Sequence, residues 1–151
     1  MNKYRFTKNW FLGSEIKKNI LNYYKGNEPI SILEIGCYEG LSSVFFADNL
    51  LNNQQSSMIC VDPFLTINNN DHQNILKDNQ EENFDFNIKS STNFDKILVK
   101  KITSDSFFET NNIYFNLIYI DGCHEPDFIT RDMENSFKFL KKDGIMWMDD
   151  Y

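Results

Sequence analysis

Short apolar runs recur along the chain, separated by more polar stretches. Each run is rich in Ile, Val, Leu or aromatic residues, and most end at Gly or Asp, which is typical of buried strands. We expect five strands, at residues 31–35, 58–61, 97–102, 115–120 and 145–148. Because helical patterns lie between them, the order of elements predicts an α/β fold with a doubly wound, mostly parallel sheet.

The intervening stretches carry apolar residues at helical spacing. A helix is expected over residues 14–25, where Ser14 can cap the first turn. Further helices are expected over residues 41–51, 81–89 and 126–140, with a short helix capped by Asp or Ser within residues 103–106. The expected inner side of the helix over 126–140 consists of Phe128, Ile129, Met133, Phe137 and Leu140. The Asn-rich stretch 64–83 is expected to be a surface excursion with at most a short helix at residues 71–77.

The chain is expected to be one domain with an N-terminal extension. A length of 151 residues is typical of a single domain, and no internal repeat is visible. Residues 1–29 form a helical segment in which Trp10, Phe11 and Leu12 are expected to anchor the chain. Residues 30–151 form the α/β domain.

The turn after the first strand is the first candidate for a functional site. Gly36 allows the chain to leave the strand through a turn that most residues resist, and Gly40 allows the next helix to approach sheet and ligand closely. Glu34 comes just before the turn, so we expect its carboxylate to face the crevice at the carboxyl ends of the strands. Glu39 is assigned to the loop surface, and the backbone of Tyr38 is a candidate cofactor contact.

Asp62 ends the second strand and extends the candidate site. A carboxylate in this position can accept hydrogen bonds from the hydroxyls of a ribose, either in a dinucleotide or in another adenosine cofactor. The spacing Gly36-x-x-x-Gly40 is not the G-x-G-x-x-G that seats a pyrophosphate on a helix N-terminus. The pattern therefore favours a cofactor without phosphate.

The composition excludes several classes of protein. The chain has 15 Lys and Arg against 22 Asp and Glu, with a formal net charge of -7, which disfavours a nucleic-acid partner. No stretch approaches the roughly 20 apolar residues of a membrane span, and the N-terminus lacks the apolar core of a signal peptide. We therefore expect a cytoplasmic protein with no membrane partner. The three cysteines form no CxxC pair and are expected to be reduced.

Five sequence blocks resemble the class I S-adenosylmethionine-dependent methyltransferases, in the branch that includes sugar and macrolide O-methyltransferases. The blocks are LEIGCYEGLS at 33–42, VDPF at 61–64, SDS at 104–106, IDGCH at 120–124 and MDDY at 148–151. The resemblance implies that S-adenosylmethionine (SAM) is the cofactor. Its methionine part would lie on the backbone from Gly36 to Gly40, its ribose on Asp62, and its adenine between Asp105 and Ser106. Glu34, Tyr38 and Asp121 complete the implied cofactor set.

The resemblance also implies how catalysis would proceed. Related enzymes bind a divalent metal through carboxylates after the fourth and fifth strands, here Asp121, Asp149 and Asp150. Three convergent carboxylates suit a hard cation such as Mg²⁺, and Mn²⁺ accepts the same oxygen ligands. His124 corresponds to the base that takes a proton from the acceptor hydroxyl, and imidazole can accept a proton near neutral pH. The acceptor would be a small molecule or a glycan.

Several alternatives stay open at this point. A metal-independent methyltransferase with a nitrogen acceptor uses the same cofactor, and a non-catalytic binding module retains the same fold. A nicotinamide-dependent oxidoreductase is the least favoured because its pyrophosphate fingerprint is absent. Family members continue into two further strands, so the resemblance implies a domain truncated after strand five. The exposed edge of that strand would then be a route to a homo-oligomer.

Overall fold

The computed structural model describes residues 3–13, 15–24, 28–65 and 79–149, which form an α/β domain. Five strands alternate with helices along the chain. In order, the elements are η1 (Trp10–Gly13), α1 (Ile16–Tyr23), β1 (Ser31–Ile35), α2 (Leu41–Leu50), β2 (Ser57–Val61), α3 (Gln80–Ser90), η2 (Phe94–Lys96), β3 (Ile97–Lys100), α4 (Ser104–Thr110), β4 (Phe115–Ile120), α5 (Pro126–Lys138) and β5 (Leu140–Met148).

The five described strands form one parallel sheet in the order β3-β2-β1-β4-β5. Ile35 at the end of β1 is in register with Val61 of β2 and Ile120 of β4, and Ile120 pairs with Met148 of β5. The strand ends are therefore level, so the residues that follow them share one edge. The strand order reverses direction between β1 and β4, which is where open α/β sheets bind ligands.

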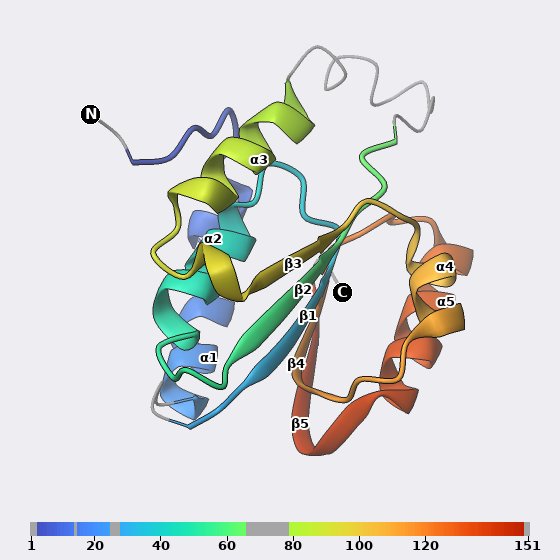
Figure 1. Cartoon of the computed structure of the whole chain (residues 1–151). Coiled ribbons are helices and arrows are strands. Elements are labelled where there is room, and N and C mark those ends of the chain that lie inside the picture. Colours follow the sequence, from blue (N-terminus) through green and yellow to red (C-terminus); the bar gives the residue numbers. More distant parts are fainter. Residues whose placement is uncertain (1–2, 14, 25–27, 66–78, 150–151) are drawn as a thin grey trace.

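Helices cover both faces of the sheet, as the doubly wound prediction requires. Figure 1 shows α1, α2 and α3 on one face and α4 and α5 on the other. Alternate residues of β1 serve the two faces, because successive side chains of a strand point in opposite directions. Ile32 packs into the core under α1 and α2, whereas Leu33 and Ile35 belong to the core under α4.

The sequence located most elements closely, and β1 and β4 have the predicted bounds. β3 ends at Lys100, two residues before the predicted end. β5 begins at Leu140, before the predicted start, because an irregularity with a φ of +62° at Asp143 lies inside the strand instead of ahead of it. Helix α4 is capped by Thr103, whose Oγ1 accepts the Ser106 N–H at 3.3 Å, and the expectation of Asp or Ser was wrong.

The inner side of α5 was predicted wrongly. Phe128, Met133 and Phe137 are 44%, 36% and 68% exposed, while the buried residues of α5 are Asp132 and Ser136. Helical spacing shows which residues share a face, but it does not show which face packs on the sheet. The residues of α5 that pack inward, Asp132 and Ser136, lie among the predicted apolar positions, and Asp132 lies beside the backbone of Gly122. Leu140 belongs to β5 and not to the helix.

The N-terminal segment is anchored as expected through Phe11, which is buried, although Trp10 is 63% exposed. Three sequence expectations lie outside the described residues: the cap at Ser14, the short helix at 71–77 and the metal ligand Asp150. Within the described part of the chain, no helix combines the length and apolar character needed to cross a membrane.

Candidate cofactor and active site

The turn after β1 has an unusual backbone. Gly36, Tyr38 and Gly40 have φ angles of +81°, +48° and +80°. A Cβ atom on Gly36 would lie 2.1 Å from the carbonyl oxygen of Asp121, so the turn and the end of β4 are in backbone contact. Glycine is required at this position because both the conformation and the space exclude a side chain. The predicted role of Gly36 in forming the turn is confirmed.

The side chain of Asp62 connects this turn to the end of β2 through hydrogen bonds. Its Oδ2 accepts the N–H groups of Cys37 at 2.7 Å and Tyr38 at 3.1 Å, and its Oδ1 accepts the N–H of Phe64 at 2.7 Å. The sequence predicted that the Asp62 carboxylate would lie beside the first strand, but it did not predict that the carboxylate would accept hydrogen bonds from the amides of the turn. A carboxylate has about four acceptor positions, so one remains for a ligand hydroxyl.

Glu34 does not face the crevice, contrary to the sequence-based expectation. The residue is fully buried, and its carboxylate accepts hydrogen bonds from the hydroxyls of Ser42 and Ser43 at the start of α2. The thiol of Cys60 lies 3.5 Å from its Oε2. Burial raises the pKa of Glu34 to about 7, and the charge of Asp121 adds to the rise, while the serine hydroxyls oppose it. Glu34 therefore joins β1 to α2 beneath the turn.

The buried Glu34 predicts a specific pH dependence of stability. Between the ordinary pKa of 4.5 and about 7, the unfolded chain has lost this proton and the folded chain has kept it. The free energy of unfolding should therefore fall as pH rises through this window, by about 3 kcal/mol from this residue. Urea denaturation at several pH values in this window measures the free energy of unfolding of the wild type and of Glu34→Gln. The wild type should lose stability as pH rises, relative to Glu34→Gln, because other titrating groups affect both proteins equally. An identical dependence in the two proteins would contradict this assignment.

Carboxylates follow the ends of β4 and β5 as well. Asp121 donates its N–H to Ile35 O at 2.8 Å, and Asp149 donates its N–H to Ile120 O at 2.9 Å, so both stand at the shared edge. The hydroxyl of the buried Tyr119 donates to Asp121 Oδ2 at 3.3 Å. Burial raises the pKa of Tyr119, and the charges of Asp121 and Asp149 raise it further. The two carboxylates therefore lie near the same phenol group, and their implied role as metal ligands stays a prediction.

His124 lies on the exposed side of this cluster. Its Nε2 is 3.8 Å from Asp121 Oδ1, and its side chain is 53% exposed. The sequence-predicted pair is thus brought together, with the imidazole accessible to a ligand and the carboxylate beside it.

Asp105 and Ser106 lie on the first turn of α4, at the end of the loop that follows β3. Asp105 pairs with Arg131 of α5 at 3.5 Å, and both side chains are about half exposed. Ser106 is exposed, and its hydroxyl accepts from Thr103 Oγ1 at 3.1 Å. Both residues therefore present polar groups to solvent, which leaves their predicted role beside adenine as a prediction.

Asp132 is a buried carboxylate that the sequence analysis missed. It is only 5% exposed, and burial raises its pKa, whereas a hydrogen bond with Ser104 lowers it. Its Oδ2 would lie 3.5 Å from a Cβ atom placed on Gly122. Asp132 therefore supports the Asp121-Gly122 loop from behind. The sequence did contain a signal for this residue, because Asp132 is a polar residue among apolar residues at helical spacing.

Potential metal ligands gather in one other place. Among residues 3–13, 15–24, 28–65 and 79–149, the possible ligand atoms of Glu34, Cys37 and Cys60 lie within 4.8 Å of one another. Burial raises the pKa of both thiols, and Glu34 already accepts two serine hydroxyl bonds. Protonated thiols are poor metal ligands, so we assign this group to the core beneath the turn. The predicted set around Asp121 and Asp149 includes Asp150, which is outside the described residues.

Comparison with known proteins identifies the family. A family model described as a methyltransferase domain matches residues 33–151. The chain belongs to this methyltransferase family. The match begins in β1 and includes the turn, Asp62, Asp121 and His124. No curated protein sequence matches the chain.

Solved structures share the fold of this methyltransferase domain at low sequence identity. A candidate O-methyltransferase from Klebsiella pneumoniae is 12% identical, with a TM-score of 0.69 over 96% of this chain and 58% of that one. An O-methyltransferase from Bacillus cereus in complex with SAH is 15% identical, with a TM-score of 0.63 over 88% of this chain and 53% of that one. The precorrin-6y C5,15-methyltransferase of Geobacter metallireducens is 12% identical, with a TM-score of 0.67 over 97% and 67%.

The names of these neighbours show how much the shared fold implies about the methyl acceptor. Two have names that specify O-methylation and one has a name that specifies methylation of a precorrin carbon skeleton, so the shared fold does not fix the acceptor. The chain spans between 53% and 67% of the length of these three proteins.

Proposed function

We propose that this methyltransferase domain binds SAM at the turn after β1 and transfers the methyl group to a hydroxyl of a small molecule or glycan. The observation that carries the proposal is the convergence of two features at the switch point of the sheet. One is the turn from Gly36 to Gly40, held by Asp62; the other is the Asp121–His124 pair at the end of the neighbouring strand. The family match and the SAH complex of the Bacillus cereus neighbour support this assignment.

The cofactor would be held by groups from three strand ends. The carbonyls of the turn would bind the methionine part, because the N–H groups of Gly36, Cys37, Tyr38 and Gly40 already have acceptors. The remaining acceptor position of Asp62 would take a ribose hydroxyl. Asp105 and Ser106, exposed on α4, would flank the adenine. Glu34 and Tyr38 contribute by shaping the turn.

Methyl transfer would then need a positioned acceptor and a base. When bound, SAM supplies an electrophilic methyl group on a sulfonium, which passes to the acceptor oxygen as the carbon–sulfur bond breaks and a carbon–oxygen bond forms. His124 would take the hydroxyl proton, and Asp121, 3.8 Å from its Nε2, would stabilise the resulting imidazolium. The chain contributes mainly by holding the acceptor and the base near attack distance.

We further propose that the carboxylates after β4 and β5 hold a divalent cation. Asp121 and Asp149 offer oxygen donors near one phenol, which suits Mg²⁺ or Mn²⁺, and Asp150 follows directly in the sequence. Such an ion would lower the pKa of the acceptor hydroxyl. The alternative is a metal-independent enzyme with a nitrogen acceptor, for which the exposed His124 alone would supply the base.

Measuring Mn²⁺ binding distinguishes the metal-dependent enzyme from the metal-independent one, and it does not require a known acceptor. We expect Asp149→Asn to weaken Mn²⁺ binding by about tenfold or more, because an amide is neutral and offers one oxygen. The measurement is electron paramagnetic resonance of free Mn²⁺ during titration of the protein. Asp95→Asn is the matched control, since Asp95 is exposed in η2. Equal affinity in Asp149→Asn and the wild type would remove the metal from the proposal.

A further inference from the structure

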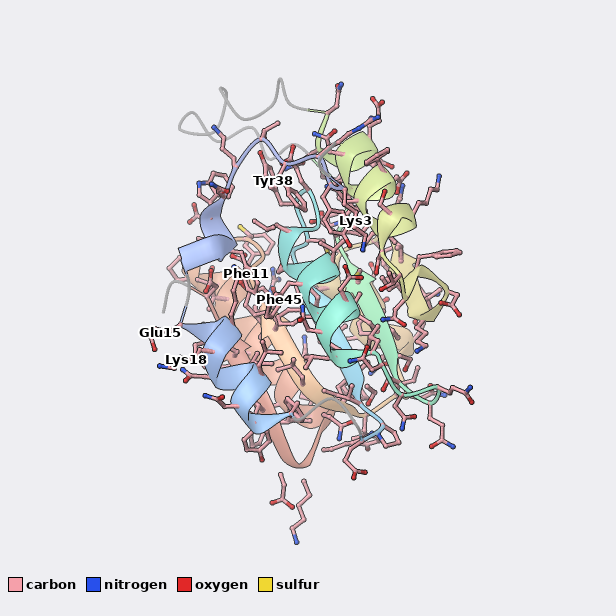
Figure 2. All side chains as sticks on the ribbon, turned by 90° about the vertical axis from the view of Figure 1, so that its left-hand side faces the viewer. Lys3, Phe11, Glu15, Lys18, Tyr38 and Phe45 are labelled. Atoms are coloured by element: carbon pink, nitrogen blue, oxygen red, sulfur yellow. The ribbon has the colours of Figure 1, made fainter. Side chains whose placement is uncertain are left out.

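A segment at the N-terminus lies across the turn. We call residues 3–11 the N-terminal strap. In Figure 2 it leaves η1 and passes over the start of α2 toward α3, with Tyr38 below it. Phe11, at one end, is buried edge-on against Phe45 and Phe46, and Lys3, at the other, bonds Asp48 of α2 at 2.9 Å. The strap is thus fixed at both ends around the turn.

Glu39 joins the strap to the turn. Although the sequence placed it on the loop surface, the residue is only 1% exposed. Its carboxylate accepts the Thr7 N–H at 2.6 Å, the Thr7 hydroxyl at 3.1 Å and the Asn83 side-chain amide at 2.7 Å. One buried carboxylate thereby connects the strap, the turn and α3. Hydrogen bonds to an ionised carboxylate are about twice as strong as those between neutral groups.

Asn87 of α3 closes the same connection. The residue is fully buried, and its Nδ2 donates to the Glu39 carbonyl at 2.8 Å and to the Arg5 carbonyl at 2.6 Å. Its Oδ1 accepts the Arg5 N–H at 2.7 Å. Both backbone groups of Arg5, the N–H and the carbonyl, are therefore hydrogen-bonded to Asn87. The Cζ atom of the Arg5 guanidinium lies 3.7 Å from the centroid of the Phe86 ring.

The turn needs such support because its backbone is strained. Tyr38 has a φ of +48°, a conformation that a side chain disfavours and that persists only when the surroundings impose it. Asp62 holds the N–H groups of Cys37 and Tyr38 from the sheet side. On the other side the ring of Trp10 packs against Tyr38 at a tilt of 33°, with centroids 5.1 Å apart, and Glu39 accepts the Thr7 N–H.

We propose that the N-terminal strap is part of the SAM site and that Glu39 is its positioning residue. This inference rests on the proposed function, because it assigns the turn to the cofactor. The turn between Asp62 and the strap is held in the binding conformation before the cofactor arrives, so cofactor affinity depends on contacts that do not touch the cofactor. By linkage, SAH binding must in turn tighten the contact between Thr7 and Glu39.

The test uses the full chain, with SAH as the probe. Glu39→Gln removes the charge at constant size. Should Glu39→Gln fail to fold, Thr7→Ala removes the hydroxyl contacts of the strap with Glu39 Oε1 at 3.1 Å and with the Tyr38 hydroxyl at 3.5 Å, and keeps the backbone N–H bond to Glu39. We expect each variant to weaken SAH binding by about tenfold, measured by calorimetric titration. In the wild type, SAH should slow hydrogen exchange at the Thr7 amide, and this protection should be smaller in Thr7→Ala. Thr110→Ala is the matched control, because its hydroxyl bonds only the Phe107 carbonyl in α4.

The outcomes are distinguishable. If the wild type binds SAH and both variants bind it with wild-type affinity, the strap has no part in the site and the inference is overturned while the proposed function stands. If the wild type does not bind SAH, both fall together. If Thr7→Ala loses affinity without a change in its unfolding temperature, and Thr110→Ala loses none, the strap acts on the turn and not on global stability.

Discussion

Replacing Gly36 by alanine should severely destabilise the native fold. The new Cβ would lie 2.1 Å from Asp121 O and 2.6 Å from Gly122 Cα, and neither backbone atom can move without separating β1 from β4. The φ of +81° adds the cost of a left-handed conformation, about 1–2 kcal/mol. We expect a loss of more than about 4 kcal/mol in the free energy of unfolding, a large part of the roughly 5–15 kcal/mol that stabilises a native domain. Circular dichroism and urea denaturation measure it.

The other glycines of the site provide graded controls. In Gly40→Ala the new atom would lie 3.0 Å from a ring carbon of Phe84, and the φ is +80°, so we expect an intermediate loss. In Gly122→Ala the nearest atoms are 3.5 Å away, an ordinary contact, and stability should change little. A Gly36→Ala protein as stable as Gly122→Ala would show that the turn does not pack against β4 as described.

Asp62→Ala should eliminate cofactor binding. The substitution removes the acceptor for the N–H groups of Cys37, Tyr38 and Phe64 and, under the proposed function, the partner of the ribose. Without this acceptor the three N–H groups would have no partner, and the turn would no longer be bound to the end of β2. We therefore expect SAH affinity to fall by about 100-fold or more. Calorimetric titration measures the affinity, and near-ultraviolet circular dichroism shows whether the variant is folded.

A second substitution at Asp62 separates charge from shape. Asp62→Asn keeps the size of the side chain and one acceptor oxygen, so the turn should be held in part and binding should weaken less than in Asp62→Ala. Wild-type SAH affinity in a folded Asp62→Ala protein would place the cofactor elsewhere, even if the chain is a methyltransferase.

The strands and the glycine turn were predictable because their signals are local. A buried strand such as β4 is a continuous apolar run bounded by turn residues, and its bounds were read directly from the sequence. The two glycines of the turn, and the acidic residues that follow the strands, can likewise be recognised within short segments of the sequence. Parallel strand ends meet at one edge, so Asp62 could be placed beside the first strand, and the family resemblance implied a shared site for Asp121 and Asp149.

The errors arose where a side chain's partner is distant in the sequence. Glu34 was expected in the crevice, but its partners Ser42 and Ser43 lie in the first turn of α2, beyond the glycine turn, and bind its carboxylate in the core. Glu39 bonds Thr7, 32 residues earlier, and no periodicity marks such a pair. On α5 the exposed Phe137 and the buried Asp132 reverse the usual rule, and only the packing against Gly122 reveals it.

Equilibrium dialysis of labelled SAH against the full chain tests the central claim most directly. It detects binding whatever the heat of binding, and it requires neither acceptor nor metal. The account predicts saturable binding of one SAH per chain, which unlabelled SAM displaces. A chain that unfolds cooperatively, and is therefore folded, yet retains no SAH would contradict the account and would leave a non-catalytic module of the methyltransferase fold as the better description.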